Sequence, residues 1–177
     1  MKKILFVVTS HDKLGDTGKP TGYYLSEVTH PWEALGRDFK IDVVSPKGGE
    51  APAEGVDLSD PINKKFWEDP AWRKIMANTM RPTEVKPEDY AAIFYAGGHG
   101  VMWDFPGNTE LAGICSQIYR NGGVVSAVCH GPAGLLNVFL EDGQRLISGR
   151  RLTAFSNEEE KLNGTVPAVP FLLQSRA

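Results

Sequence analysis

The chain has few cysteines, no long apolar run and no cluster of basic residues, and each absence excludes a class of protein. Its two cysteines, Cys115 and Cys129, provide no disulfide framework and fit a reducing, cytoplasmic environment. No stretch approaches the roughly 20 apolar residues of a membrane-spanning helix. The net charge is −3 and the basic residues are scattered, so neither nucleic acid nor a membrane surface is an expected partner.

The sequence also lacks the pattern of a secretory leader and an internal linker. Two lysines precede an apolar run near the N-terminus, but that run is short and polar residues follow it where a cleavage site would stand. No repeat or linker-like tract divides the 177 residues, of which 41% are hydrophobic. We therefore expect one domain over 1–177 with a substantial hydrophobic core.

Short apolar runs alternate with segments of helical spacing along the chain. The continuous runs rich in β-branched residues are typical of strands buried on both faces. Such strands are expected at 3–9, 40–46, 91–98 and 123–130, with a shorter one at 150–155. Helices are expected at 21–38, 110–123 and 131–140, and Pro31 should break or kink the first. This alternation indicates an α/β fold with a mostly parallel sheet.

The segment 47–90 does not follow the simple alternation. Glycine- and proline-rich turns come first, and helical spacing over 61–80 is then interrupted at Pro70. An excursion of this length is either a functional cap over the carboxyl ends of the strands or a surface insertion with its own small apolar cluster. Both interpretations stay open.

The strand expected at 123–130 leads into Cys129. Residues 127–131 read Ala-Val-Cys-His-Gly, the small-x-nucleophile-x-Gly pattern of a nucleophile elbow with cysteine as the nucleophile. A thiol at the start of the following helix should have a lowered pKa, because the helix N-terminus favours the thiolate. The alternative is an inert cysteine buried at the end of a core strand.

A glycine-rich turn follows the strand expected at 91–98. The carboxyl ends of parallel strands meet at one edge of a sheet, where ligands bind. Backbone N–H groups of His130 and of the Gly97–Gly98 turn are therefore candidates for an oxyanion hole. The simpler alternative for the glycines is a tight turn without a role in binding.

A general base and a carboxylate must also be found for a cysteine nucleophile. The histidines are His11, His30, His99 and His130, so no later histidine exists, and His130 is the nearest in sequence. A carboxylate is available from the run at 158–160. Three glutamates in a row usually begin a solvated helix, and composition alone does not choose among Glu158, Glu159 and Glu160.

Four stretches together resemble a known family: TGYYLSEVTHPW, YAGGHGVMWDFPGN, IYRNGGVVSAVCHGPAGL and LTAFSNEEE. The sequence resembles the ThiJ/PfpI superfamily, of the class I glutamine amidotransferase-like fold, and within it the heat-shock chaperone and glyoxalase III branch. The resemblance implies a flavodoxin-like, three-layer α/β sandwich. It also implies that Cys129 is the nucleophile, His130 its partner, Glu160 the third member and Glu27 the acid beside the thiol.

The same resemblance assigns the surroundings of the thiol. It implies that Gly98 and His130 supply the oxyanion-hole amides, and that Gly97, His99, Met102 and Trp103 belong to the pocket-forming loop. Each assignment has a simpler alternative. Glu27 fits a solvated helix position, and Met102 and Trp103 fit packing positions as well as substrate contacts.

The function implied by the resemblance is a glutathione-independent, cofactor-independent glyoxalase that converts methylglyoxal to lactate, with a small aldehyde as substrate and a homodimer as the assembly. The alternatives are a stress-response holding chaperone and a cysteine peptidase, amidase or deglycase that uses the same site. A metal site built from Cys129, His130, Glu27 and His99 is not expected, because adjacent Cys-His spacing does not match the usual ligand patterns.

One departure from the branch concerns the C-terminal end. Members of this branch usually continue beyond the position of Ala177 with a further strand and helix. We therefore expect a short C-terminus, with Phe171, Leu172 and Leu173 lacking their cover and forming an exposed apolar patch.

Overall fold

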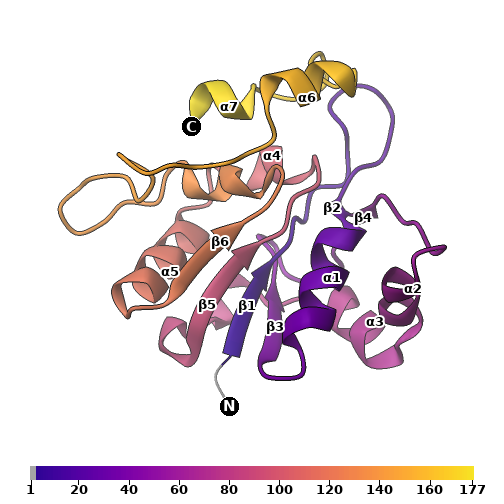
Figure 1. Ribbon diagram of the computed structural model, residues 1–177, viewed down its shortest axis with the longest axis horizontal. Helices are drawn as coiled ribbons and strands as arrows, with labels where there is room; N and C mark the ends of the chain where they lie inside the picture. The colour runs from indigo at the N-terminus through magenta and orange to yellow at the C-terminus, as the bar shows by residue number, and fades with distance from the viewer. Residues whose placement is uncertain (1–2) are drawn as a thin grey trace.

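A four-stranded parallel sheet forms the centre of the molecule, in a computed structural model that describes residues 3–177 (Figure 1). The strand order is β3-β1-β5-β6, and every neighbouring pair is parallel. The strands are β1 (Lys3–Val7), β3 (Lys40–Val44), β5 (Tyr90–Tyr95) and β6 (Val124–Ala127). All four strands expected in this sheet are confirmed, and each ends two or three residues before its expected end. The residues that follow leave the sheet to form the loops at its carboxyl edge.

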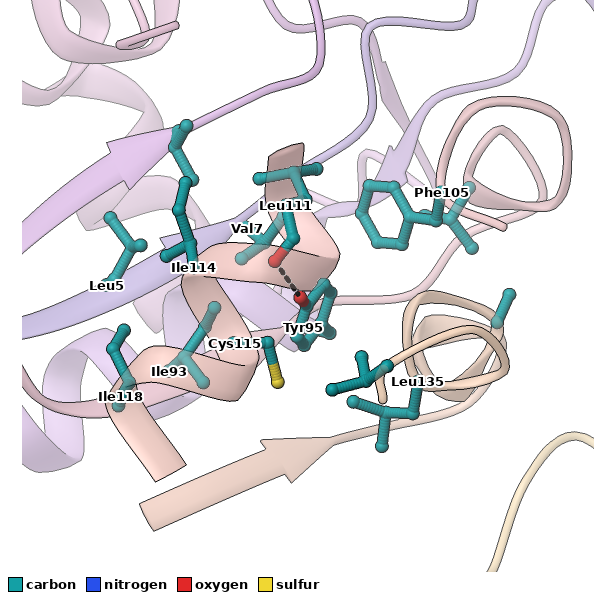
Figure 2. Close-up of a cluster of buried hydrophobic side chains, with 14 of the residues drawn as sticks. Leu5, Val7, Ile93, Tyr95, Phe105, Leu111, Ile114, Cys115, Ile118 and Leu135 are labelled. Atoms are coloured by element: carbon teal, nitrogen blue, oxygen red, sulfur yellow. Dashed lines mark hydrogen bonds between the residues drawn. The ribbon is translucent and has the colours of Figure 1, made fainter. Parts of the chain in front are cut away.

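The central strand β1 is buried on both faces, as its unbroken apolar run predicts. Leu5 and Val7 face a core that also contains α5 (Thr109–Arg120), whereas Ile4 and Phe6 face a second core containing α1 (Leu25–Leu35). Figure 2 shows the first core, in which the Tyr95 hydroxyl donates to the carbonyl of Leu111 at 3.3 Å. Helices on both faces of the sheet make the three-layer sandwich that the resemblance implied.

Helix α1 runs through Pro31 without ending there, so the expected break is wrong. Proline removes one backbone donor, which in a regular helix would bond to the carbonyl of Glu27. The turns on either side retain their packing: Leu25 and Val28 are fully buried in the second core. Burial of the apolar face therefore outweighs the single lost hydrogen bond.

The segment 47–90 contains two short helices, α2 (Pro61–Glu68) and α3 (Pro70–Ala77). The interruption expected at Pro70 is confirmed, because Asp69 ends α2 and caps α3 by accepting from the N–H groups of Ala71 and Trp72. The segment also contributes β4 (Ala53–Glu54), which pairs in parallel with β2 (Tyr23–Tyr24). Two 3₁₀ turns, Pro82–Glu84 and Pro87–Asp89, lead into β5.

Two expected elements are absent from the described chain. Residues 131–140 form a five-residue 3₁₀ helix, η3 (Gly131–Leu135), followed by turns, in place of an α-helix. A β-carbon on Gly134 would lie 2.6 Å from the Tyr95 ring, so this turn packs closely against β5. Residues 150–155 form no strand. The Phe155 N–H donates a hydrogen bond to the Cys129 carbonyl at 2.8 Å, which ties this segment to the turn after β6.

The C-terminal helices α6 (Asn157–Leu162) and α7 (Leu173–Arg176) lie over the carboxyl edge of the sheet, at the top of Figure 1. Leu173 is 1% exposed and belongs to the first core, with Phe171 packed against it. The expectation that this apolar end lacks cover is therefore wrong for Leu173.

The short helix α4 (Val101–Asp104) follows β5. In residues 3–177, no helix combines the length and apolar character needed to cross a membrane.

Candidate active site

Cys129 sits on a sharp turn directly after β6. Its φ of 58° lies in the left-handed region, and among residues 3–177 it is the one residue other than glycine with such a value. A β-carbon on Gly131 would lie 2.3 Å from the carbonyl oxygen of Tyr95, so the chain can pass there only without a side chain. This is the strained strand-to-helix geometry that the small-x-Cys-x-Gly pattern predicts.

The turn after β5 is held against the thiol by glycines and by Glu27. A β-carbon on Gly97 would lie 2.6 Å from Glu27 Oε2 and 2.8 Å from Cys129 Cβ. The Gly97 N–H donates to Glu27 Oε2 at 2.7 Å, and Gly98 has a φ of 97°. The backbone amides of Gly98 and His130 both face the sulfur and favour its thiolate, because each acts to lower the pKa of Cys129. The two amides expected to form an oxyanion hole therefore converge on Cys129.

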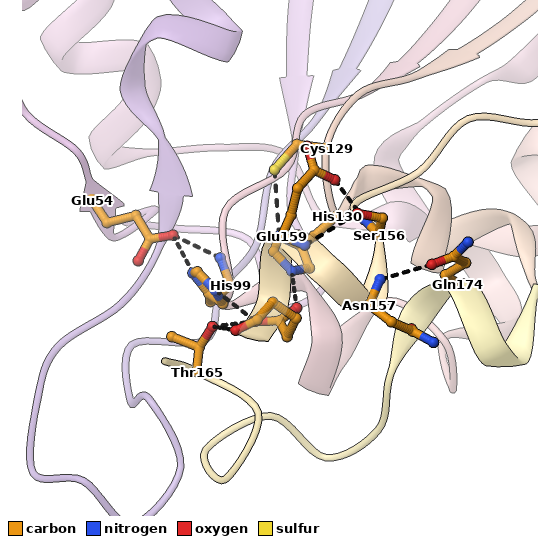
Figure 3. Close-up of polar contacts among 10 residues, drawn as sticks. Glu54, His99, Cys129, His130, Ser156, Asn157, Glu159, Thr165 and Gln174 are labelled. Atoms are coloured by element: carbon orange, nitrogen blue, oxygen red, sulfur yellow. Dashed lines mark hydrogen bonds and ion pairs between the residues drawn. The ribbon is translucent and has the colours of Figure 1, made fainter. Parts of the chain in front are cut away.

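A chain of three side chains leads away from the sulfur (Figure 3). Cys129 Sγ lies 3.4 Å from His130 Nδ1, and His130 Nε2 lies 2.7 Å from Glu160 Oε2. His130 and Glu160 are buried, and the Phe155 ring stacks on the imidazole with centroids 4.2 Å apart. The imidazole is thereby fixed in orientation between a thiol and a carboxylate, the arrangement of a cysteine triad.

The structure separates the three glutamates that composition could not distinguish. Glu158 is exposed, and Glu159 forms a capping box with Ser156 at the start of α6. Glu160 is the one that turns inward, with 1% of its surface exposed. Glu158 therefore faces solvent and Glu159 caps the start of α6. Of the three, Glu160 is the one that contacts His130.

The electrostatics of the thiol differ from the expectation. Burial, reinforced by the negative charge of Glu27, raises the pKa of Cys129 to about 12, although the Gly98 and His130 amides oppose the shift. Burial also raises the pKa of Glu27. The predicted lowering of the thiol pKa is wrong, because burial and the charge of Glu27 outweigh the effect of the two backbone amides. The resting thiol keeps its proton and needs a base at the moment of attack.

Glu54 and Thr165 belong to the site but carry no sequence signal that marks them. Glu54 Oε1 accepts from the His99 N–H at 2.7 Å and faces His99 Nδ1 at 3.4 Å. The Thr165 hydroxyl donates to Glu160 Oε1, and His99 Nε2 faces the same oxygen at 3.2 Å. Glu54 lies 45 residues from His99 in the sequence and outside every motif, so only the fold brings the two together.

A cavity of about 560 Å³ opens beside the thiol. Its lining includes most of the predicted site residues together with side chains from α6 and from the segment 47–90: Tyr24, Glu27, Glu54, Gly55, Gly98, His99, Cys129, His130, Phe155, Glu159, Leu162 and Asn163. Gly97 supports the cavity from behind. Trp103 and Met102 are not in this lining: Trp103 stacks on His11 with centroids 4.8 Å apart, and Met102 is buried in the first core.

Within the described chain, His99, His130 and Glu160 form the one group of side chains whose arrangement could hold a metal ion, with ligand atoms within 4.8 Å of one another. Both imidazoles already direct Nε2 at an oxygen of Glu160, at 3.2 and 2.7 Å. An ion would have to replace these hydrogen bonds. The expectation of a site without metal stays a prediction.

Comparison with known proteins bears on this site. The model of the DJ-1/PfpI family matches residues 20–169. The chain is 36% identical to the glutathione-independent glyoxalase HSP31 of Saccharomyces cerevisiae, over 92% of this chain and 72% of that protein. It is 32% identical to glyoxalase 3 of Candida albicans, over 93% of this chain and 73% of that protein.

Solved structures agree with the sequence comparison. The structure of the Rapid Encystment Protein 24 KDa of Francisella tularensis superposes with a TM-score of 0.95 at 42% identity, covering 99% of this chain and 80% of that one. The structure of glyoxalase III from Candida albicans gives a TM-score of 0.85 at 29% identity, covering 94% and 73%.

Proposed function

Because this chain belongs to the DJ-1/PfpI family, we propose that its Cys129 site makes it a glutathione-independent glyoxalase that converts methylglyoxal to lactate. One observation carries the proposal: the Cys129 thiol contacts the His130 imidazole, which contacts the buried Glu160 carboxylate, and the Gly98 and His130 amides face the sulfur. Relatives at 32–36% identity over most of the chain are named as enzymes of this type.

The first step is addition of the thiol to the aldehyde carbon. His130 Nδ1 takes the thiol proton while sulfur forms a bond to that carbon, and the carbonyl electron pair moves onto oxygen. The N–H groups of Gly98 and His130 stabilise the resulting oxyanion, which then takes a proton to give a hemithioacetal. Glu160 accepts from His130 throughout, and its negative charge stabilises the imidazolium.

The second stage moves a proton between the two carbons. Glu27, ionised, removes the hydrogen of the former aldehyde carbon, and the neighbouring ketone oxygen takes a proton to give an enediol. Protonation of the second carbon gives a lactoyl thioester, so one carbon is oxidised and its neighbour reduced without an external redox partner. Water then cleaves the carbon–sulfur bond, which releases lactate and restores the thiol.

Incubation of the purified protein with methylglyoxal in D₂O, without glutathione, tests this mechanism. We expect lactate that carries deuterium at C2, because the proton passes through a solvent-exchanging carboxylate. Cys129→Ala should form no lactate, and Cys115→Ala, which changes a thiol far from the cavity, should retain the activity. Lactate without deuterium would exclude the enediol route, and activity in Cys129→Ala would exclude this nucleophile.

A holding chaperone is the second candidate function, and one surface feature favours it. A groove of about 730 Å³ lies over β5 and β6, with Leu35, Phe39 and Phe94 in its lining and Val124 62% exposed beside it. Protection of an aggregating client by Cys129→Ala, and its loss in Val124→Lys, would support this function. Hydrolysis of peptides, glutamine or glycated amines by the wild-type protein would instead favour the peptidase, amidase or deglycase alternative.

The proposed enzyme acts on a small aldehyde in the cytoplasm as a homodimer. Both cysteines are free, which supports the reducing compartment, and the family resemblance supports the dimer. Light scattering of the protein as it elutes from a size-exclusion column measures the molar mass of the assembly. A mass near 39 kDa is expected for two copies of the 19.4 kDa chain.

A further inference from the structure

Glu54 comes from the segment 47–90 but reaches the site described above. Strand β4 pairs with β2 so that Glu54 lies opposite Tyr24, and the Tyr24 N–H donates to the Gly97 carbonyl at 3.1 Å. The buried hydroxyl of Thr21 donates to Glu54 Oε2 at 2.7 Å. Glu54 is therefore fixed on a small sheet that is itself anchored to the turn after β5.

Glu54 holds His99 by two contacts. Its Oε1 accepts from the backbone N–H of His99 at 2.7 Å, which fixes the turn that presents the Gly98 amide to the sulfur. The same oxygen faces the ring nitrogen Nδ1 at 3.4 Å, while Nε2 on the far side of the ring faces Glu160 Oε1 at 3.2 Å. The imidazole thus bridges two carboxylates, Glu54 on one side of the ring and Glu160 on the other.

The groups around His99 favour its charged form. Glu54 approaches from β4, Glu160 from α6, Glu27 from α1 and His130 from the elbow. Burial lowers the pKa of His99, but the hydrogen bonds with Glu160 and Glu54 outweigh it and raise this pKa to about 9. A cationic His99 in turn helps His130 and Thr165 to hold the pKa of Glu160 well below its usual range, against the effect of burial.

We propose that Glu54 is a positioning residue for the reaction, acting through His99 to keep Glu160 in place as the acceptor for His130 and to aim the Gly98 amide at the sulfur. The inference deepens the proposed function and rests on it for its kinetic readout. It also assigns part of the segment 47–90 to the site, because Glu54, from that segment, is one of the two carboxylates that His99 bridges.

The experiment compares Glu54→Gln with Glu50→Gln, an exposed residue of the same segment outside the site. Glu54→Gln should lower kcat by about 10- to 100-fold with KM changed by less than about threefold, because outer contacts orient the reacting groups without touching substrate. The alkaline limb of its kcat profile should move down by about one pH unit or more. Glu54→Asp keeps the charge and should recover part of the loss, and Glu50→Gln should match the wild type.

A second measurement does not depend on lactate formation. The NMR titration midpoint of His99 should fall from near 9 toward the ordinary histidine value in Glu54→Gln, and fall less in Thr21→Val, which removes only the supporting hydroxyl. An unchanged His99 midpoint, or a kcat within twofold of the wild type, would overturn the inference. A wild-type protein that forms no lactate but shows the shifted midpoint would overturn the proposed reaction and leave the Glu54–His99 coupling supported.

Discussion

The two cysteines lie in different surroundings that give their thiols similar pKa values. Cys115 is fully buried on α5, where burial raises its pKa to about 12. Cys129 reaches about 12 by burial and by the charge of Glu27. What separates them is the neighbourhood: Cys129 has an imidazole, a second carboxylate, two backbone amides and a cavity beside it. A base within reach, rather than the resting pKa, distinguishes the nucleophile candidate from the inert thiol.

Alanine in place of each cysteine makes the most direct test of this comparison. Cys129→Ala should lower kcat/KM for methylglyoxal by about 10⁴-fold or more, because it removes the atom that bonds to substrate. Cys115→Ala should leave kcat/KM within about threefold and lower the free energy of unfolding by about 1 kcal/mol, through a small cavity. Lactate assays and urea unfolding of both variants measure these effects. Equal losses of activity would show that the two thiols are not distinguished as proposed.

Removal of the carboxylate at the far end of the triad should have the next largest effect. Glu160→Gln keeps the shape of the side chain but no longer holds His130 with a negative charge, so kcat should fall by about 10²- to 10⁴-fold. Glu158→Gln, an exposed neighbour in the same run, is the matched control and should stay within about twofold. A wild-type rate in Glu160→Gln would remove the carboxylate from the mechanism.

The two cysteine regions also differ in how much room the backbone leaves for a β-carbon at a nearby glycine. Gly131→Ala should lower the free energy of unfolding by about 1–3 kcal/mol, because its β-carbon would meet the Tyr95 carbonyl at 2.3 Å. Gly113→Ala, on α5 beside Cys115 with nothing within 4 Å of the new carbon, should raise the stability by about 0.5–1 kcal/mol. Urea unfolding compares the pair, and a stable Gly131→Ala would contradict the tight elbow.

The last expected effect concerns the pH dependence of stability. The pKa of His99 rises from 6.5 to about 9 on folding, so its protonation stabilises the fold fully below pH 6.5 and this contribution is lost as pH rises toward 9. We expect a loss of about 3 kcal/mol across that range. His99→Gln should flatten the curve, and urea unfolding at several pH values measures both proteins. A wild-type curve as flat as that of His99→Gln would argue against the cationic bridge.

The strands and the sharp turn at Cys129 could be predicted from sequence because their signals are local. Buried parallel strands read as continuous apolar runs, and the elbow pattern spans five residues around Cys129. The family resemblance, rather than composition, selected Glu160; the physical reason for the selection is the capping box that occupies Glu159. These inferences needed only short windows of sequence or a known pattern.

The features that could not be predicted depend on contacts between distant residues. Glu54 joins the site through the pairing of β4 with β2, and Leu173 finds its cover in the first core rather than in a further segment of chain. The thiol pKa depends on how deeply Cys129 is buried beside Glu27, which the elbow pattern does not reveal. The family resemblance placed Trp103 in the pocket-forming loop, yet the side chain stacks on His11.

The left-handed backbone at Cys129 has opposite consequences for the stability of the fold and for the proposed reaction. Glycine adopts a φ near 58° without the strain that any side chain meets there, so Cys129→Gly should fold more tightly than Cys129→Ala. Selection for heat resistance alone would therefore favour glycine at this position. The strain at Cys129 is therefore a loss of stability that the proposed reaction of its thiol would account for.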